Sequence, residues 1–236
     1  MNRAAVDFGN SRIKVARFDS EGQILEHKIF QKEEEVESWL TEKKIDSLIV
    51  ATVRKESKIN YPQGKIHYLN TSSKLPFVNQ YGSPDTLGQD RIAVISAAAS
   101  IFPDENTLIF DTGTCMTIDF LASTGIYKGG NISPGPFMRA QAMHQFTSVL
   151  PLADLELSTP DMGTNTAEAL SAGIKTGIKN EILGYINSHS SANTNLTIIL
   201  CGGYIHNFEF PHNLKIFARP NFVLEGLYHL LLLNEN

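Results

Sequence analysis

Cysteine is scarce in this sequence, and its scarcity excludes one class of small protein. Only two cysteines, Cys115 and Cys201, occur among 236 residues, and each lies close to an apolar, strand-like run. Small secreted domains that depend on disulfides carry many more cysteines at close spacing. We therefore expect both side chains to be buried free thiols in a reducing cytosol.

Long apolar runs and excess basic charge are lacking as well. Runs such as Leu230–Leu233 fall far short of the ~20 residues that a membrane-spanning helix needs. Lysine and arginine together number 20, against 25 aspartates and glutamates, and no basic cluster is present that could neutralise a nucleic-acid backbone. We expect a soluble cytoplasmic protein with no membrane partner and no nucleic-acid partner. The 7 histidines show no metal-ligand spacing, so none is assigned a role.

What the sequence does contain is one pattern that occurs twice. Residues 4–14 and 109–117 each predict a strand, an Asp-x-Gly turn with a hydroxyl side chain, and a second strand; the two aspartates, Asp7 and Asp111, lie 104 residues apart. Such a turn gathers a carboxylate, backbone N–H groups and a hydroxyl at one point, which suits a phosphate chain with its metal. One such turn alone is as well explained by an ordinary hairpin. Its recurrence at half the chain length favours an enzyme that uses ATP.

The coarse order of elements predicts an α/β protein built from two similar halves. Three strands are followed by a helix over residues 33–44 and a strand over 46–52, and a helix over 92–101 ends the first half. The order then begins again with a strand, a turn and a strand. This restart indicates a duplication, and we place the two domains at residues 1–105 and 106–236.

The second half continues with a glycine-rich run, helices and one buried strand. Asn165, with Glu168 three residues later, fits a capping box at a helix N-terminus. The expected elements are helices over 137–148, from 165 to 178 or beyond, and over 222–233, with a strand over 196–200.

Six motifs in a fixed order connect these features to a known family. They are Asp7-x-Gly-Asn-Ser-x-x-Lys14, Gly88-x-Asp90-Arg91, Asp111-x-Gly-Thr-x-x-Thr117-x-Asp119, Gly129-Gly-x-Ile-x-Pro-Gly135, Gly163-x-Asn-Thr166 and Gly202-Gly203. Together they resemble the type III pantothenate kinases over nearly the whole chain, whereas the Asp-x-Gly turn alone is shared by the wider actin, sugar-kinase and heat-shock ATPase superfamily. The resemblance implies two duplicated ribonuclease-H-like domains with mixed five-stranded sheets. It also implies ATP-dependent phosphorylation of pantothenate to 4′-phosphopantothenate, the first step of coenzyme A biosynthesis.

The resemblance implies site residues position by position. Asp90 would accept the proton of the pantothenate hydroxyl, and Asp111 would bind a monovalent cation, K⁺ or NH₄⁺. The enzyme would act as a homodimer, with the substrate pocket completed at the subunit interface. ATP with Mg²⁺ would be bound by Asp7, Phe8, Gly9, Asn10, Ser11, Arg12, Ile13, Lys14 and Thr114, and pantothenate by Tyr81, Gly88, Gln89, Asp90, Arg91 and Thr166.

Elementary chemistry agrees with these assignments, and each has a simpler alternative. Asp90 lies at or just before a predicted helix N-terminus, where the helix dipole favours the ionised carboxylate that a base requires; a plain N-cap is the alternative. Arg91 offers a planar fork for a substrate carboxylate, and a surface ion pair is the alternative. The alternative is local packing for Tyr81 and an ordinary helix start for Thr166. Gly202-Gly203 would let adenosine lie against bare backbone, or would form a tight turn.

Two other functions fit parts of the sequence. A non-catalytic accessory or regulatory protein could keep the fold, but it would have no need of Asp7, Lys14, Asp90, Arg91 and Asp111 together. Another small-molecule kinase of the same superfamily would also use the Asp-x-Gly turns. The short chain and the Gly-x-Asp-Arg motif argue against that second alternative.

Overall fold

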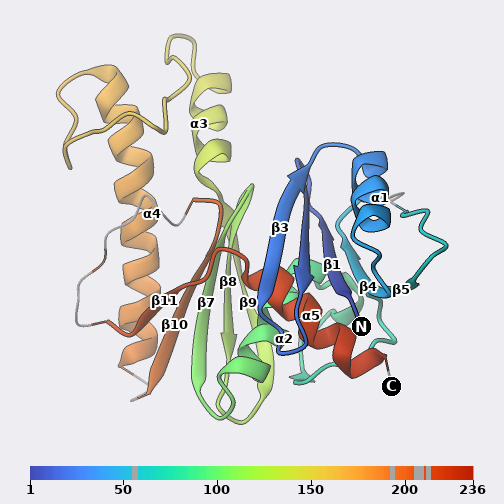
Figure 1. Ribbon diagram of the computed structural model, residues 1–236. Helices are drawn as coiled ribbons and strands as arrows, with labels where there is room; N and C mark the ends of the chain where they lie inside the picture. The colour runs from blue at the N-terminus through green and yellow to red at the C-terminus, as the bar shows by residue number, and fades with distance from the viewer. Residues whose placement is uncertain (55–57, 192–194, 205–209, 211–213, 236) are drawn as a thin grey trace. The chain divides into compact units, whose positions relative to one another are not determined.

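The computed structural model describes residues 1–54, 58–191, 195–204, 210 and 214–235 (Figure 1). Contacts within the chain divide it into two compact units. The first unit comprises Met1–Asp104, Leu121–Gly129 and Asn221–Asn236, and the second comprises Glu105–Phe120 and Gly130–Pro220. Because these units are defined by contacts and are discontinuous in sequence, the expected boundary of the duplication between residues 105 and 106 stays a prediction.

The first unit contains a mixed five-stranded sheet with the order β3-β2-β1-β4-β5. β1 runs antiparallel to β2, and β2 antiparallel to β3, whereas β1, β4 and β5 run parallel to one another. The strands are β1 (Arg3–Phe8), β2 (Ile13–Phe18), β3 (Ile24–Phe30), β4 (Ser47–Thr52) and β5 (Lys65–Tyr68). The helices of this unit are α1 (Glu33–Glu42), the short 3₁₀ helix η1 (Pro84–Thr86), α2 (Gln89–Ile101) and α5 (Phe222–Asn234).

Both faces of this sheet are covered, which explains why β1 is apolar at nearly every position. Ala4, Val6 and Phe8 pack on one face with the buried side chains of α1, among them Trp39. α2 and α5 pack against each other, and α5 packs on β1. Phe18 stacks on Tyr228 of α5 with ring centroids 4.5 Å apart.

The second unit contains β7 (Asn106–Thr112) and most of β8 (Cys115–Leu121), together with β10 (Leu196–Gly202) and β11 (Ile216–Ala218). β9 (Ile126–Pro134) begins in the first unit, where Ile126 and Tyr127 pair with the short strand β6 (Val78–Asn79). The helices are α3 (Pro136–Gln145) and α4 (Thr166–Ser190).

The strand order supports the predicted duplication. The second sheet has the order β11-β10-β7-β8-β9-β6. Without β6 it repeats the order of the first sheet, because β7, β8, β9, β10 and β11 take the places of β1, β2, β3, β4 and β5. The expected pair of mixed sheets is therefore present, but the second sheet has six strands where we expected five, since β6 extends its edge.

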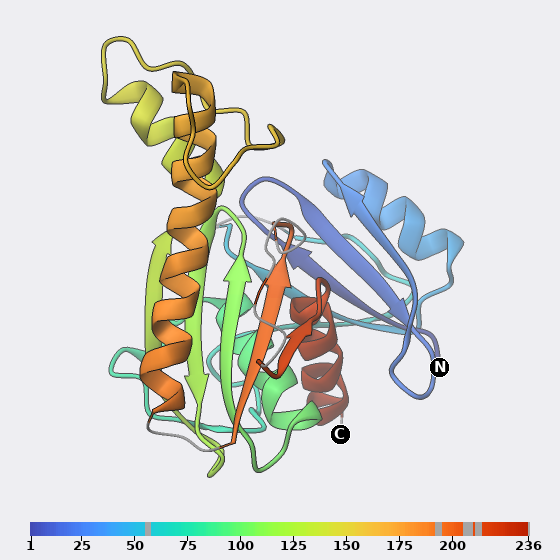
Figure 2. The ribbon, with the colours of Figure 1, turned by 90° about the vertical axis from the view of Figure 1, so that its left-hand side faces the viewer.

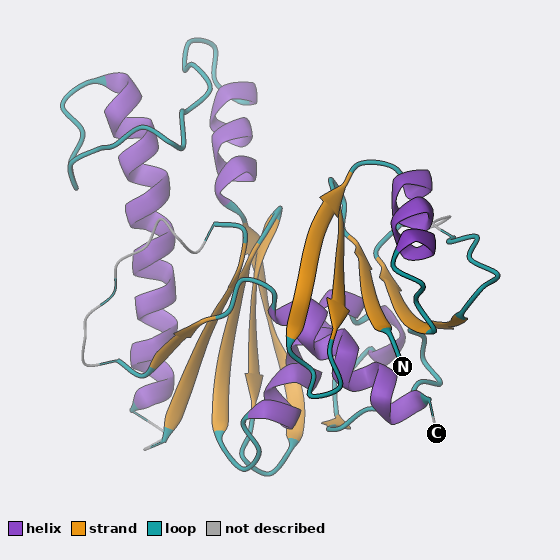
Figure 3. Cartoon of the chain, viewed as in Figure 1, coloured by secondary structure: helices purple, strands orange, loops and turns teal. Residues whose placement is uncertain are grey.

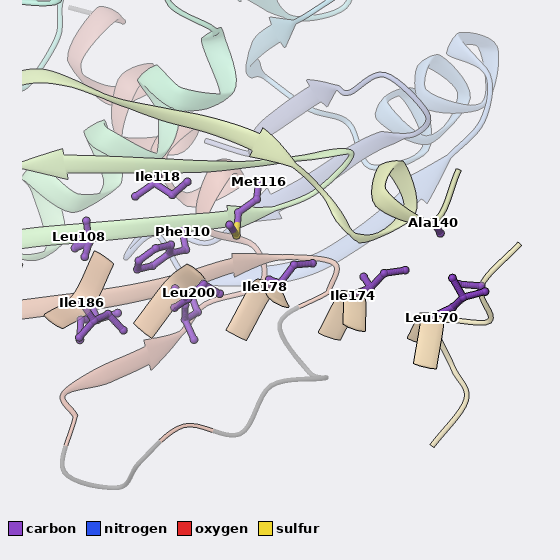
Figure 4. Close-up of a cluster of buried hydrophobic side chains, with 13 residues drawn as sticks. Leu108, Phe110, Met116, Ile118, Ala140, Leu170, Ile174, Ile178, Ile186 and Leu200 are labelled. Carbon is purple, nitrogen blue, oxygen red and sulfur yellow. The ribbon is translucent and has the colours of Figure 1, made fainter. Parts of the chain in front are cut away.

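The core of the second unit depends on one stripe of α4. Ile174, Ile178, Ile182 and Ile186 recur at every fourth residue, which places them on one side of a helix. They pack with side chains of β7, β8 and β10, including Phe110 (Figure 4). α4 runs along the sheet of the second unit (Figures 2 and 3). The helix extends to Ser190, well beyond Ile178, as far as this apolar stripe continues.

Candidate active site

The first Asp-x-Gly turn joins β1 to β2 in the first unit. Asp7 and Lys14 lie directly opposite each other in the antiparallel pair, so their side chains project from the same face of the sheet. Asp7 is buried, whereas the turn residues Asn10, Ser11 and Arg12 are exposed. The hairpin therefore presents an exposed polar turn beside Asp7 and Lys14 on one face of the sheet, which is the arrangement expected of a phosphate-binding segment.

Two of the residues expected at the ATP site have side chains in the core. Phe8 and Ile13 are fully buried among the side chains that cover the opposite face of the sheet. Alternation along each strand explains this, since neighbours of Asp7 and Lys14 must point the other way. Phe8 and Ile13 would therefore meet a nucleotide through backbone atoms alone.

The start of α2 carries the Gly-x-Asp-Arg motif. Gly88 is the N-cap, so Asp90 is the second residue of the helix and the alternative of a plain N-cap does not apply. Oδ1 of Asp90 accepts a hydrogen bond from the backbone N–H of Arg91 at 2.8 Å. An ideal Cβ on Gly88 would lie 2.5 Å from the same Oδ1, so only glycine leaves this carboxylate its place.

Gln89 ties the start of α2 to the ends of two strands. Its Oε1 accepts a hydrogen bond from the backbone N–H of Thr52 at 2.7 Å, and its Nε2 donates to the carbonyl of Leu69 at 2.9 Å. Thr52 is the last residue of β4. The hydrogen bonds of Gln89 thus fix the position of the first turn of α2, which contains Asp90, relative to the carboxyl end of β4.

Arg91 is buried between aromatic side chains. Arg91 is only 4% exposed, so the alternative of a surface ion pair does not apply. Nη2 donates to the hydroxyl of Tyr127 at 2.8 Å, and the guanidinium carbon lies 5.5 Å from the ring centroid of Tyr81. The rings of Tyr81 and Tyr127 are themselves 6.0 Å apart. Tyr81, Arg91 and Tyr127 therefore form one cluster, and Tyr127 is a member that the motifs did not include.

The second Asp-x-Gly turn joins β7 to β8 in the second unit. Gly113 and Thr114 are exposed, and the backbone N–H of Gly113 donates to the carbonyl of Cys115 at 2.9 Å. Gly135 packs directly on this turn, because its N–H donates to the carbonyl of Thr114 at 3.1 Å and a Cβ there would lie 2.3 Å from the carbonyl oxygen of Gly113. The close approach explains why the glycine-rich run ends in glycine.

Asp111 lies against the end of β10. It pairs with Cys201 in the parallel register of β7 and β10, and an ideal Cβ on Gly202 would lie 2.5 Å from Oδ1 of Asp111 and 2.5 Å from the carbonyl oxygen of Thr112. Gly202 has a φ of +92°, a conformation that favours glycine. The close packing of Gly202 on Asp111 and Thr112 leaves no room for a side chain at this position.

Thr166 begins α4. Asn165 is the N-cap, and its Oδ1 accepts a hydrogen bond from the N–H of Glu168 at 3.1 Å, which confirms half of the predicted capping box. The Glu168 carboxylate accepts instead from the N–H and the hydroxyl of Thr164, both at 2.8 Å. These hydrogen bonds lower the pKa of Glu168. Thr166 itself is exposed and, among the described residues, makes no side-chain hydrogen bond to Asp111 or Thr114.

Each unit therefore gathers its own part of the predicted site. The first unit brings together the turn of Asp7 and Lys14, the start of α2 with Asp90, and the cluster around Arg91. The second unit brings together Asp111, Thr114, Gly135 and Gly202. Within the part of the chain that the structure describes, no group of three or more His, Cys, Asp or Glu side chains could hold a metal ion. Mg²⁺ that arrives with a nucleotide needs no such group, since one or two carboxylates and the phosphates themselves are its usual ligands.

Over the described ranges of the chain, no helix combines the length and the apolar character needed to cross a membrane.

Comparison with known proteins identifies the family. A family model described as type III pantothenate kinase matches residues 4–188. The chain belongs to the type III pantothenate kinase family. A curated member from Bacteroides fragilis, strain YCH46, is 39% identical over 238 residues, which cover 98% of this chain and 97% of the relative. The family and enzyme class predicted from the motifs, a kinase of coenzyme A biosynthesis that uses ATP with Mg²⁺, are confirmed.

Solved structures show the same fold at much lower identity. A Campylobacter jejuni protein described as a Baf family transcriptional activator has a TM-score of 0.63 at 22% identity, over 99% of both chains. The activator of 2-hydroxyisocaproyl-CoA dehydratase from Clostridium difficile, solved with bound ADPNP, has a TM-score of 0.60 at 12% identity, over 98% of this chain and 94% of the other. These similarities confirm the predicted fold class.

Proposed function

We propose that the protein transfers the γ-phosphoryl group of ATP to the hydroxyl of pantothenate, giving 4′-phosphopantothenate as the first step of coenzyme A biosynthesis. The observation that carries the proposal is the start of α2, where Gly88 leaves room for a carboxylate and Gln89 anchors the helix to β4. A carboxylate, a buried guanidinium and a tyrosine hydroxyl lie within one short segment and its packing partners. That set suits an acceptor that carries both a hydroxyl and a carboxylate.

Asp90 would accept the proton of the acceptor hydroxyl. Its carboxylate lies in the first turn of α2, at the positive N-terminal end of the helix. A carboxylate is a weak base, but phosphoryl transfer through a loose transition state leaves the proton on the hydroxyl until late. Positioning then matters more than basicity, and the contacts of Gly88 and Gln89 supply it.

Arg91 would hold the carboxylate of pantothenate, with Tyr81 and Tyr127 as neighbours. The guanidinium is planar and carries several N–H donors, a geometry that matches the two oxygens of a carboxylate. The hydrogen bond from Nη2 to Tyr127 orients the planar group. Thr166, the first residue of α4, is the further substrate contact that the family motif assigns.

The first Asp-x-Gly turn would bind the phosphate chain of ATP, and Thr114 of the second turn is the further ATP contact that the family motif assigns. Ser11 and Thr114 are exposed hydroxyls at those turns, and Lys14 supplies positive charge opposite Asp7. Mg²⁺, when bound with the nucleotide, neutralises charge that builds up on the transferring group. A monovalent cation, K⁺ or NH₄⁺, would be bound by Asp111, the residue that the family motif assigns.

The protein would act as a homodimer through the region of α3 and the segment that follows it. Several large apolar side chains there are strongly exposed, and a second copy of the same surface would cover them. They are Phe137 at 57% exposure, Phe146 at 87%, Val149 at 86% and Met162 at 83%.

The proposed reaction is tested by ADP release from the purified protein with Mg²⁺-ATP and pantothenate, in K⁺ buffer and in Na⁺ buffer. We expect turnover that requires pantothenate and is faster in K⁺. Asp90→Asn should lower kcat about a hundredfold, because a general base contributes at least that much in most enzymes. The matched control is Asp85→Asn, which removes an exposed carboxylate from η1 just before the same helix. Absence of pantothenate-dependent ADP release from the folded protein would contradict the proposal.

A further inference from the structure

Arg54 is a cation that lies at the first Asp-x-Gly turn without belonging to any of the six motifs. It follows β4, which runs parallel to β1, and the two strands end side by side because Phe8 pairs with Thr52. The pairing continues one step further, since the N–H of Val53 donates to the carbonyl of Phe8 at 3.2 Å. Arg54 therefore lies at the carboxyl end of β1, the end at which ligands bind in sheets of this kind.

The side chain of Arg54 is fixed over the turn. Its Nε donates to the carbonyl of Gly9 at 2.8 Å, and the guanidinium carbon lies 5.9 Å from the ring centroid of Phe8. Its backbone is held as well, because the N–H of Arg54 donates to the hydroxyl of Thr52 at 2.9 Å. Arg54 is half-buried, so the guanidinium is ordered by several contacts at once and is not a freely moving surface charge.

Most of the donors of this guanidinium remain available. Of its N–H groups, only the one on Nε is used, and within the described ranges neither Nη atom has a hydrogen-bond acceptor or an acidic partner. A guanidinium whose two Nη atoms are available presents the fork that binds phosphate oxygens in pairs. The neighbouring turn residues Asn10 and Ser11 are exposed, so an anion can reach this place.

We propose that Arg54 binds the phosphate chain of ATP at the Asp7–Lys14 turn and so adds a second cation to Lys14. The proposal rests on the function proposed above, in which this turn binds the nucleotide. A triphosphate stays anionic after Mg²⁺ binds, and charge shifts during transfer, so fixed positive groups at this position stabilise both the bound and the reacting state.

The same contacts connect the nucleotide turn to the acceptor segment. The hydroxyl of Thr52 accepts a hydrogen bond from the backbone N–H of Arg54, and the N–H of Thr52 donates to the side chain of Gln89. Gln89 immediately precedes Asp90. The carboxyl end of β4 is therefore a common support for Arg54 and for the base. A phosphate held by Arg54 and a hydroxyl held near Asp90 are positioned from one strand end within the first unit.

The experiment compares Arg54→Gln and Arg54→Lys with the wild type, and Lys28→Gln is the control. Lys28 lies on β3 of the same unit, where it pairs with Glu26, so its replacement removes one positive charge away from the turn. We expect Arg54→Gln to raise KM for ATP about tenfold to a hundredfold while KM for pantothenate changes less than about twofold. Arg54→Lys should recover part of the loss because it keeps the charge, and Lys28→Gln should behave as the wild type.

A binding measurement separates phosphate contact from a mere tether of the turn. The upward shift of the thermal unfolding midpoint by Mg²⁺-ATP and by adenosine is measured for each variant. We expect Arg54→Gln to weaken binding of ATP and to leave that of adenosine unchanged. Equal weakening of both ligands, or no weakening of either, would overturn the assignment. If the wild type binds Mg²⁺-ATP but does not phosphorylate pantothenate, the proposed function fails and this binding comparison still decides the role of Arg54.

Discussion

At the scale of single residues, Gly88 determines where the carboxylate of Asp90 can lie. A methyl group on Gly88 would collide with Oδ1 of Asp90, and the side chain would have to rotate away. We expect Gly88→Ala to lower kcat for pantothenate phosphorylation about a hundredfold, as displacements of about 1 Å do. Stability should fall by less than about 1 kcal/mol, because only an N-cap preference is lost.

The control for this prediction is Gly82→Ala in the same loop. A Cβ on Gly82 has nothing within 4 Å, so both activity and stability should be preserved. Steady-state kinetics measure kcat, and thermal unfolding measures the stability, of the two variants. A Gly88→Ala protein with the kcat of the wild type would show that the observed position of Asp90 is not needed.

Protonation of His67 makes the free energy of unfolding depend on pH. It lies on β5 with its Nε2 3.2 Å from the hydroxyl of Ser73, and burial lowers the pKa of His67 below its ordinary value of 6.5. The unfolded chain then takes up the proton first, so the stabilisation is fully present above pH 6.5 and is lost as the pH falls through the folded pKa. We expect the free energy of unfolding to decline from about pH 7 to about pH 5 more steeply in the wild type than in His67→Gln. Urea unfolding across this range measures both slopes, and equal slopes would exclude the effect.

Candidate site residues can be predicted from sequence where they form a continuous motif, but not where they come together only through packing. Asp90 was placed at a helix N-terminus from sequence, and the structure puts it there. Tyr127 and Arg54 were missed, because their contacts with Arg91 and Gly9 join positions far apart in the chain. Only the folded sheet brings such pairs together.

At the scale of elements, the contact between α2 and α5 depends on one glycine. A Cβ on Gly226 would lie 1.8 Å from the carbonyl oxygen of Ala93, and backbone cannot yield as a side chain can. We expect Gly226→Ala to destabilise the protein by about 1–3 kcal/mol or more, as overpacking does. Denaturant unfolding measures the change.

Gly184 on α4 is the matched control for that change. It is exposed and a Cβ there has nothing within 4 Å, so Gly184→Ala should stabilise the protein by about 0.5–1 kcal/mol through helix propensity alone. Opposite signs for the two substitutions are expected. If both substitutions lowered the free energy of unfolding, the effect of Gly226→Ala would come from replacing any helical glycine and not from the contact with α2.

Strong periodicity made some elements predictable, and its absence hid others. The capping box at Asn165 and Glu168 indicated the start of α4, and the isoleucine stripe from Ile174 to Ile186 accompanies its extension to Ser190. β6 has only two residues and forms by pairing with Ile126 and Tyr127, so nothing in its own sequence marks it. Short strands that exist through a distant partner leave no local pattern.

At the scale of the whole molecule, the exposed apolar side chains after α3 predict association. We expect the wild type to have the mass of a dimer in light scattering, and Phe146→Ser with Val149→Ser to weaken the dimer more than about tenfold, because each side chain loses its burial. Leu25→Ser on β3 removes an exposed apolar side chain of the first unit and is the control. A wild type that stays monomeric at every concentration would contradict the homodimer.

The duplication was predictable from the spacing of Asp7 and Asp111, and the repeated strand order supports it. The composition of the compact units was not predictable in the same way. α5 has the apolar pattern of any buried helix, and nothing in that pattern says which sheet it covers. The contacts of Gly226 and Tyr228 show that it belongs with β2 and α2.

This return of α5 to the first unit sets an order of events on the ribosome. Arg3 of β1 is hydrogen-bonded to Glu235 at 2.9 Å, and Phe18 stacks on Tyr228, so strands that are translated before the second unit are covered by a helix that is translated after it. The residues of the second unit are all translated before that helix. The second unit can therefore close first, and the earliest strands wait, with one apolar face uncovered, for residues 222–234 to leave the ribosome.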